Sequence, residues 1–355
     1  MEKELEKLMK REKIKIELNR ITKKIKDKVV LITGAGGSIG TELSKQIALC
    51  EPKLVLLLDF SENRVYETEM ELLRLNKQIN SKIIIANIRE KNTIEEIIKR
   101  YQPNYIFHAA AHKHVHIMEE HPLEAIKNNI LGTYYLMESA ERHNVEEFIF
   151  ISSDKAVKTV NIMGATKKIC EMMIEEKNKS SNTNYISVRF GNVLESDGSV
   201  IPLFRQQIQN GGPVTVTDKR MTRFFMTIPE AVFLILEAFF LAEGGKTYIL
   251  DMGKPVKIYD VAEILIREYG YTPNKEIKII ETGIRKGEKL TEELLEDDEK
   301  LTPTNHKQIY EIQKKEENKK ILDKIRKLEE AVIQMNKKEI ETIMEKCFKE
   351  YKLKL

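Results

Sequence analysis

Short apolar runs alternate with longer amphipathic stretches from residue 28 onward. The short runs are rich in β-branched residues, as is typical of strands that are buried on both faces of a sheet. They span residues 29–32, 53–58, 82–86, 105–107, 148–151 and 185–188. Apolar residues recur at helical spacing in the stretches between them, which span 38–49, 62–76, 91–101, 122–142 and 162–178. This alternation predicts an α/β fold with a doubly wound parallel sheet.

The pattern changes on both sides of this first domain, which we place at residues 28–190. Further along, prolines and glycines separate shorter elements, so we expect 191–310 to form a smaller α/β substrate lobe, partly interleaved with the first domain. Residues 1–27 are rich in Lys and Arg, with apolar residues at roughly helical spacing. They predict a solvated amphipathic lead-in or, alternatively, a segment near an anionic membrane surface.

The last segment, 311–355, is again charged and helical in pattern. It carries one apolar stripe, which we expect to contact the core or a partner. The stripe consists of Ile321, Ile325, Leu328, Val332 and Met335.

Composition narrows the class of protein. The net charge of +3, with 32% of residues charged, gives no reason to expect a nucleic-acid partner. Cys50, Cys170 and Cys347 lie far apart, which predicts reduced thiols in a cytoplasmic protein and neither a disulfide framework nor a zinc site. No apolar run approaches the roughly 20 residues that span a bilayer, and no signal peptide is visible.

A glycine-rich turn follows the first predicted strand and opens the first predicted helix. Its residues are Gly34, Ala35, Gly36, Gly37, Ser38, Ile39 and Gly40. Glycines allow a tight turn and a close approach to a pyrophosphate, for which the helix N-terminus supplies free N–H groups. Asp59 ends the second strand, where a carboxylate binds the adenosine ribose and repels a 2′-phosphate. NAD is therefore favoured, although the nearby Arg64 keeps NADP open.

Five of the seven histidines lie between residues 108 and 121. The run begins at the end of a predicted strand, and its alternation places the side chains on a loop, not on one helix face. We expect this loop to have a structural or cofactor-lining role, with a metal site as the alternative.

Polar residues follow the strand at 148–151, at the sheet edge where α/β enzymes place their chemistry. Ser152, Ser153, Asp154 and Lys155 form this segment, and Met163 and Lys167 begin the next helix. This segment resembles the active-site segment of short-chain dehydrogenases, which carry a tyrosine at the position of Met163. A thioether cannot transfer a proton. Either the protein is catalytically dead, or Asp154 and Lys155 do the proton chemistry.

Motifs spread over residues 28 to about 300 resemble one family. They lie at 34–40, 109–114, 152–155, 161–167, 188–194, 198–202, 211–213, 222–228, 251–253 and 287–290. Together they are similar to bacterial UDP-N-acetylglucosamine 4,6-dehydratases of the polysaccharide-biosynthesis type, extended short-chain dehydrogenase/reductases with a Rossmann domain. The chain resembles the soluble domain of the long branch, in which methionine usually replaces the tyrosine. Many members of that branch carry an N-terminal membrane region, so the lead-in would be a juxtamembrane linker.

The resemblance implies an internal redox reaction. Hydride passes from sugar C4 to NAD, water leaves across C5–C6, and the hydride returns to C6. Asp154 would be the acid and Lys155 the base, while Ser153 would bind the C4 oxygen. Lys167 would bind the nicotinamide ribose, and Asn129 would help to hold that lysine. Which group takes the C4 hydroxyl proton stays open.

The resemblance also implies the walls of two pockets. The cofactor would be lined by Asn87, Ile88, Ala109, Ala110 and Ala111. The substrate would be bound by His112, Lys113, Asn192, Ser199, Val200, Arg223 and Arg285, with Arg189 as a further candidate for the diphosphate.

Two other functions compete with the dehydratase. A UDP-sugar 4-epimerase shares cofactor and substrate but needs no acid/base pair for elimination, so Asp154 and Lys155 count against it. A non-catalytic NAD(H)-binding regulator would explain Met163, but Arg223 and the segment 287–289 count against it. The resemblance also implies a homo-oligomer, because dimers through the helices near 122–142 and 162–178 are common in the superfamily, with the C-terminal helices as further contacts.

Overall fold

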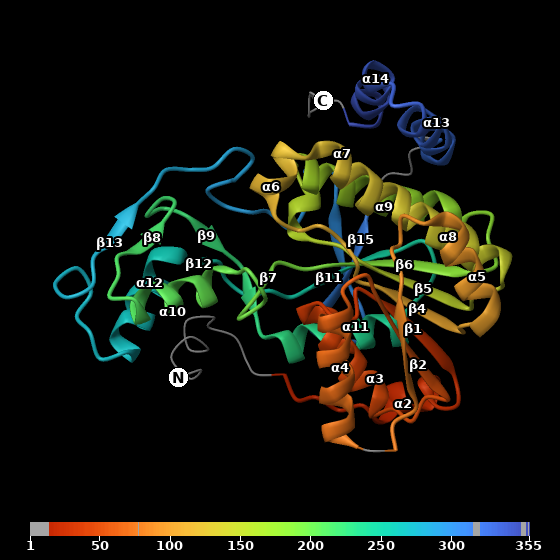
Figure 1. Ribbon diagram of the computed structural model, residues 1–355, viewed down its shortest axis with the longest axis horizontal. Helices are drawn as coiled ribbons and strands as arrows, with labels where there is room; N and C mark the ends of the chain where they lie inside the picture. Colours follow the sequence, from red (N-terminus) through yellow and green to blue (C-terminus); the bar gives the residue numbers. More distant parts are fainter. Residues whose placement is uncertain (1–13, 77, 315–319, 349–352, 354) are drawn as a thin grey trace.

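The computed structural model describes residues 14–76, 78–314, 320–348, 353 and 355. In this part of the chain the largest sheet has nine strands in the order β14-β15-β11-β6-β5-β4-β1-β2-β3 (Figure 1). They are β1 (Val29–Thr33), β2 (Leu54–Asp59), β3 (Ser81–Ile85), β4 (Tyr105–His108), β5 (Glu147–Ile151), β6 (Asn184–Arg189), β11 (Thr247–Leu250), β14 (Lys300–Pro303) and β15 (Ile309–Gln313). The strands from β11 to β3 are parallel, and β14 and β15 are antiparallel additions. The predicted doubly wound sheet is confirmed.

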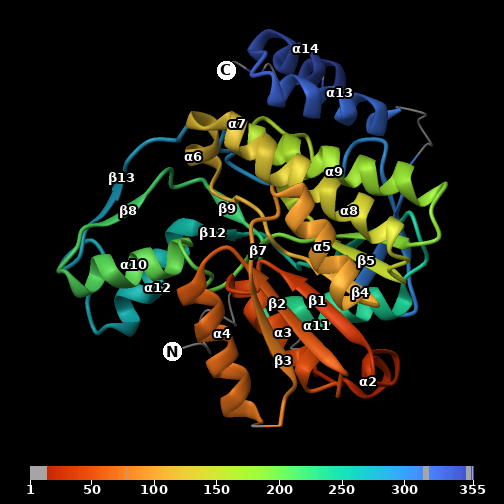
Figure 2. The ribbon, with the colours of Figure 1, turned by 45° about the vertical axis from the view of Figure 1, so that its right-hand side comes forward.

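Helices cover both faces of this sheet (Figure 2). One face carries α2 (Asn19–Ile25), α3 (Ser38–Ala48), α4 (Glu62–Leu75) and α11 (Ile228–Leu241). The other carries α5 (Lys91–Tyr101), α6 (Val115–Glu120), α7 (Pro122–Ala125), α8 (Gly132–Arg142) and α9 (Ile162–Asn178). Because each helix presents an apolar stripe to the sheet, two continuous cores form, one on each side.

The helix predicted over 122–142 is interrupted. A π-helical turn, Ile126–Leu131, separates α7 from α8. The turn buries the amide side chains of Asn128 and Asn129, and Asn129 bonds the backbone of His112. Hydrophobic periodicity does not reveal such a turn, because one extra residue in the backbone ring hardly changes the apolar stripe.

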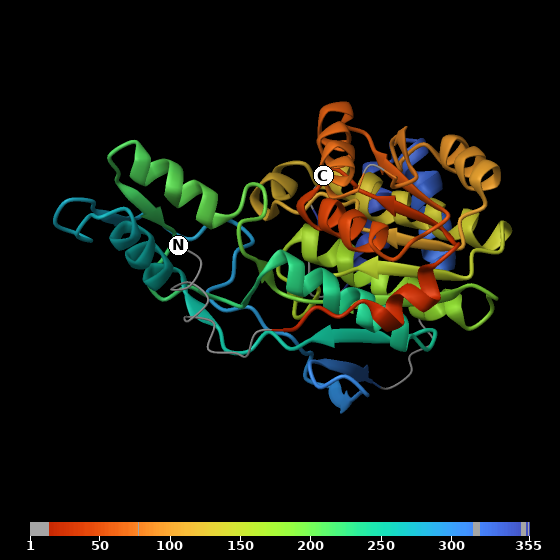
Figure 3. The same cartoon turned by 90° about the horizontal axis from the view of Figure 1, so that it is seen from below.

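A smaller lobe stands beside the carboxyl edge of the sheet (Figure 3). It contains β7 (Asn192–Val193), α10 (Val200–Gln209), β8 (Val214–Val216), β9 (Thr222–Arg223), β10 (Phe225–Met226), β12 (Val256–Lys257), α12 (Ile258–Glu268) and β13 (Ile279–Glu281). Phe204, Val261 and Leu265 belong to its separate core. The chain returns from this lobe to the sheet to form α11, β11, β14 and β15, so lobe and sheet are interleaved.

The lead-in from α2 onward is part of the folded core, so the expectation of a solvated segment is wrong for this helix. Ile21 and Ile25 are fully buried, and α2 packs against α11 (Figure 3). Arg20 also forms a two-pronged ion pair with the buried Glu237. Residues 1–13 lie outside the described residues, and among the described helices none is both long and apolar enough to cross a membrane.

The C-terminal helices α13 (Ile321–Ile333) and α14 (Lys337–Cys347) form a hairpin that lies on α9 (Figures 1 and 2). Four residues of the predicted stripe are buried there, whereas Met335 is 59% exposed because it lies beyond the end of α13. The predicted stripe is therefore core, apart from Met335. The hairpin covers part of α9, one of the two helices through which we expect a homo-oligomer, and the oligomeric state stays a prediction.

A buried ion network joins three elements behind the sheet edge. Arg189, at the end of β6, is fully buried and donates to both oxygens of Glu171 on α9, at 3.1 and 2.7 Å. It also donates to both oxygens of Glu299, at 2.7 and 3.2 Å, just before β14. Burial opposes the charge on Glu299, but Arg189 outweighs it and lowers the pKa of that carboxyl to about 2. Arg189 is therefore part of the core, and the prediction that it binds the diphosphate is wrong.

Replacing Arg189 should destabilise the protein more than replacing an arginine on the surface. Arg189→Met removes the cation that is hydrogen-bonded to both buried carboxylates and leaves Lys168 near them, at 3.5 Å from Glu299. We expect a loss of about 3–5 kcal/mol in the free energy of unfolding. Guanidinium titrations of the full chain measure it. The control is Arg267→Met, which breaks an exposed pair with Glu263 and should cost less than about 1 kcal/mol.

The same network predicts a pH dependence. Because the folded pKa of Glu299 lies below the ordinary 4.5, its stabilisation is complete above about pH 4.5 and is lost as the pH falls toward about 2. Arg189→Met should flatten this part of the stability curve. If wild type and Arg189→Met lost stability equally at low pH, Arg189 would not be the group that lowers the pKa of Glu299.

Candidate active site

Three glycines of the glycine-rich turn, Gly34, Gly36 and Gly40, leave no space for a side chain. A Cβ atom at Gly34 would lie 2.7 Å from the backbone of Ala110, and one at Gly36 would lie 2.6 Å from Cβ of Arg64. At Gly40 the clash would be with the carbonyl of Gly34, at 2.0 Å. Gly37, the N-cap residue of α3, brings no capping side chain. The start of α3 therefore presents backbone N–H groups, as a site for an anionic ligand requires.

Three of the predicted cofactor residues, Asp59, Ala109 and Ala110, lie beside this turn. Asp59, at the end of β2, accepts from the backbone N–H of Gly36 at 3.0 Å, and Ala109 donates to Thr33 at the end of β1. Asn87 lies in the turn after β3 and accepts from Arg89. The side chain of Ile88 is buried in the core against Gly132.

The histidine-rich loop is held by hydrogen bonds. His108 is buried between the hydroxyls of Thr33 and Thr133, at 2.7 and 2.8 Å, and burial together with the nearby Lys167 lowers the pKa of His108 to about 3. The ring of His114 lies against Gly198 in the second lobe. Among the described residues no group of three or more His, Cys, Asp or Glu side chains could hold a metal ion. These contacts favour the structural interpretation of the loop.

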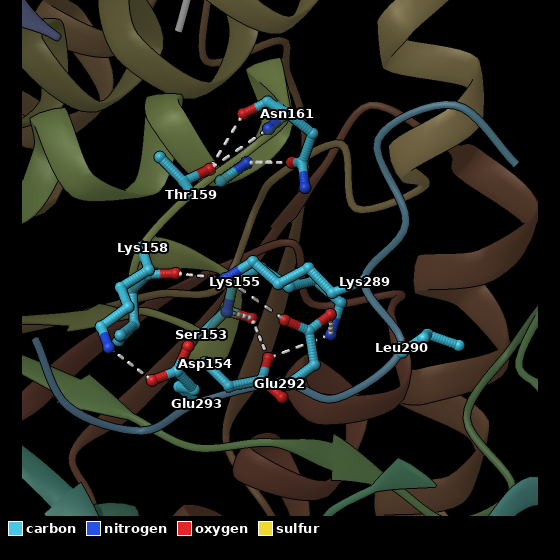
Figure 4. Close-up of polar contacts among 12 residues, drawn as sticks. Ser153, Asp154, Lys155, Lys158, Thr159, Asn161, Lys289, Leu290, Glu292 and Glu293 are labelled. Carbon is cyan, nitrogen blue, oxygen red and sulfur yellow. Dashed lines mark hydrogen bonds and ion pairs between the residues drawn. The ribbon is translucent and has the colours of Figure 1, made fainter. Parts of the chain in front are cut away.

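Asp154 and Lys155 lie in a short 3₁₀ turn at the end of β5, which Ser153 caps (Figure 4). The Ser153 hydroxyl donates to Oδ1 of Asp154 at 2.9 Å, and the same oxygen accepts from Nζ of Lys155 at 3.0 Å. Lys155 reaches across to Oδ1 of Asn192 in the second lobe, at 3.1 Å. The other oxygen of Asp154 is buried and has no hydrogen-bond partner among the described residues. A buried oxygen without a partner calls for an explanation, and a bound ligand or a catalytic role can supply one.

The start of α9 packs tightly against this turn. A Cβ atom at Gly164 would lie 2.1 Å from the carbonyl oxygen of Lys155. Met163, in the tyrosine position, is 2% exposed and belongs to the core on this face of the sheet. The side chain therefore contributes packing at this position.

Lys167 is buried one turn further along α9. Its Nζ donates to the carbonyl of Ile151 at 2.7 Å and lies over the ring of Phe150, and burial lowers the pKa of Lys167 to about 8. Asn129 does not contact it directly. Instead Asn129 donates to Thr166, the neighbouring residue, so any support for Lys167 passes through the backbone of α9.

The second lobe brings further charges to the turn. Arg223 is buried and donates to the carbonyls of Thr222 and Leu290, at 2.7 and 3.2 Å. Lys113 is partly buried, which lowers its pKa, whereas Arg285 lies exposed on a loop. Ser199 is the N-cap residue of α10, and Val200 is the first residue of that helix.

Two charged residues near the turn were not among the predicted site residues. Lys289 donates to the carbonyl of Val157 at 2.8 Å, and the carboxylate of Glu292 is buried among cations (Figure 4). Glu292 could not have been singled out, because its neighbour Glu293 has the same side chain in the same acidic run and is 47% exposed. Lys289 lies within the motif at 287–290, which was its only signal in the sequence.

Comparison with known proteins identifies the family. Residues 30–314 match the family described as polysaccharide biosynthesis protein. The chain belongs to this family, within the extended short-chain dehydrogenase/reductases. It is 48% identical over 310 residues to the capsular polysaccharide biosynthesis protein CapD of Staphylococcus aureus, covering 87% of this chain. The match spans 51% of CapD, so the chain corresponds to about half the length of that relative.

Two further comparisons bear on the family. The X-ray structure of Pen from Bacillus thuringiensis superposes with a TM-score of 0.76 at 37% identity, covering 82% of this chain and 90% of Pen. A Rickettsia rickettsii protein named UDP-glucose 4-epimerase is 34% identical over 295 residues, covering 81% of this chain and 83% of that protein. Family membership therefore agrees with the observed fold, and enzymes with different names occur among the relatives.

Gly164 should be intolerant of any side chain. Gly164→Ala drives a methyl group into the Lys155 carbonyl, which is backbone and cannot move freely, so we expect a loss of about 1–3 kcal/mol in the free energy of unfolding. Chemical denaturation measures it. Gly132→Ala is the control, because its methyl meets only the flexible end of Ile88 at 2.8 Å. Equal losses in both variants would contradict the tight packing of α9 on the turn.

Proposed function

We propose that this chain is a nucleotide-sugar 4,6-dehydratase, a hydro-lyase that converts UDP-N-acetylglucosamine to the UDP-4-keto-6-deoxy sugar. The observation that carries the proposal is the pair Asp154 and Lys155, adjacent in one turn, with a buried carboxylate oxygen left without a partner. Elimination of water across two neighbouring carbons needs an acid and a base close together, and this turn supplies both. The polysaccharide-biosynthesis family supports a nucleotide-sugar substrate.

We propose NAD as the cofactor. The close-packed turn at Gly34 and Gly36, the N-terminus of α3 and the carboxylate of Asp59 suit a dinucleotide pyrophosphate and an adenosine ribose. Asn87, Ile88, Ala109, Ala110, Ala111 and Lys167 complete the proposed cofactor residues. When bound, NAD accepts the hydride of sugar C4 and returns it to C6.

The protein groups handle the protons. Asp154 protonates the departing 6-hydroxyl, so that the C6–O bond breaks and water leaves. The proton released by the C4 hydroxyl balances the one that Asp154 gives up, so the net change is the loss of one water. Lys155 takes the C5 proton as the C5–C6 double bond forms, and it returns a proton to C5 when the hydride reaches C6. Ser153, which already donates to Asp154, binds the C4 oxygen. We propose that Arg223 and Arg285 bind the diphosphate, because one guanidinium group can donate to two phosphate oxygens at once. His112, Lys113, Asn192, Ser199 and Val200 complete the proposed substrate contacts.

The rival function with independent support is a UDP-sugar 4-epimerase, because the Rickettsia relative bears that name. An epimerase would return the 4-epimer of the substrate with no loss of water. Mass spectrometry of the product formed from UDP-N-acetylglucosamine separates the two activities, and a non-catalytic regulator would form neither product.

Removing the acid or the base should stop the dehydration. We expect Asp154→Asn and Lys155→Met to lose at least about 100-fold in kcat, because general acid and base groups contribute about 10²–10⁴-fold. Formation of the 4-keto product measures the loss. Lys158→Met is the control, because Lys158 lies in the same segment but pairs with Glu293 and Asp297 on the surface. Near-wild-type turnover in both active-site variants would refute these roles.

The cofactor preference should depend on Asp59. Asp59→Asn removes the charge that would repel a 2′-phosphate, so we expect the preference for NAD over NADP to fall by about tenfold, as for one lost charge contact. Calorimetric binding of both cofactors measures it, with the exposed Glu62→Gln as the matched control. A wild-type protein that binds NADP as tightly as NAD would overturn the proposal of NAD.

A further inference from the structure

Glu292 lies in the segment between β13 and β14. Its carboxylate faces Lys155 and Lys289 (Figure 4) and also Arg223. Its Oε1 is 3.8 Å from Nζ of Lys155 and 4.0 Å from Nη2 of Arg223. Its Oε2 is 4.0 Å from Nζ of Lys289. One carboxylate therefore contacts the proposed base and a proposed diphosphate ligand at the same time.

This carboxylate is buried and incompletely satisfied. Glu292 is 5% exposed, and its Oε2 accepts no hydrogen bond from any described residue. Burying an ionised carboxylate is costly unless nearby charges offset the loss of hydration. The three cations supply that offset together, whereas Glu293, the next residue, is exposed and pairs with Lys158 at the surface.

Arg223 and Lys289 are held in place by hydrogen bonds to backbone carbonyls. Arg223 donates to the carbonyls of Thr222 and Leu290, and Lys289 donates to the carbonyl of Val157. Lys155 is different, because its remaining partners are the side chains of Asp154 and Asn192, both of which belong to the proposed reaction centre. Glu292 can therefore transmit the fixed positions of Arg223 and Lys289 to Nζ of Lys155.

We propose that Glu292 is a positioning residue that holds Lys155 in place for the proton transfer at C5. This inference rests on the proposed dehydratase function. The carboxylate does not need to touch the sugar. It keeps Nζ of Lys155 between Asp154 and Asn192, and it does so only when the second lobe, which carries Arg223, is in place.

The test compares three variants of the full chain. Glu292→Gln keeps the shape of the side chain and removes its charge, Glu292→Asp keeps the charge on a shorter side chain, and Glu293→Gln is the matched control. For each we would measure kcat and KM for UDP-N-acetylglucosamine, the affinity for UDP, and the thermal midpoint. We expect Glu292→Gln to lower kcat on the order of tenfold, the scale of coupling between contacting residues, with KM and UDP affinity within about twofold of wild type.

Partial recovery of kcat in Glu292→Asp would support positioning by charge. A Glu292→Gln variant as active as Glu293→Gln would overturn the proposal. A parallel fall of kcat, UDP affinity and thermal midpoint, with no recovery in Glu292→Asp, would show a structural role only and would overturn it as well. If the wild-type protein forms no 4-keto product, the proposed function itself fails, and that outcome is visible before any variant is made.

Discussion

The arrangement of the candidate site depends on the buried ion network around Arg189. Its guanidinium bonds Glu171 on α9 and Glu299 before β14, and Glu171 also accepts from Ser152 at the end of β5, at 2.7 Å. One charged group thus ties the strand end, the helix that carries Lys167 and the chain returning from the second lobe. Buried charges with several fixed partners tolerate few alternative arrangements, because any displacement leaves a charge without compensation.

The second lobe completes the site from the opposite side. Asn192, Arg223, Lys289 and Glu292 all come from it or from the segment that leaves it, and they meet the turn that holds Asp154 and Lys155. Since the same segment leads into the antiparallel strands of the main sheet, the lobe is connected to the core at both ends. The charges of the site are therefore positioned by both parts of the molecule, and neither part holds a complete set.

Much of the fold was predictable from the sequence. The predicted strands and most of the helices are confirmed, because each buries a periodic apolar pattern that can be recognised locally. The π-helical turn and the docking of α2 were not predicted, since backbone geometry and the partner of an amphipathic helix leave no local signature. Arg189 and Glu292 show the same limit in the site. Arg189 could have bound a diphosphate, but its guanidinium pairs with two buried carboxylates. Glu292 lies in an acidic run, but its side chain is buried among cations.

The sequence by itself determined the class of the molecule: a doubly wound sheet, a glycine-rich turn where a dinucleotide would lie, and an Asp–Lys pair at a strand end in place of tyrosine. These features are short-range, because strand, turn and helix follow one another within a few residues. Only the tertiary structure decided which charges belong to the core and which to the site. Pairing between residues more than a hundred positions apart, such as Arg189 with Glu299 or Lys155 with Glu292, depends on how the lobe folds back, and that is set by packing of the whole chain.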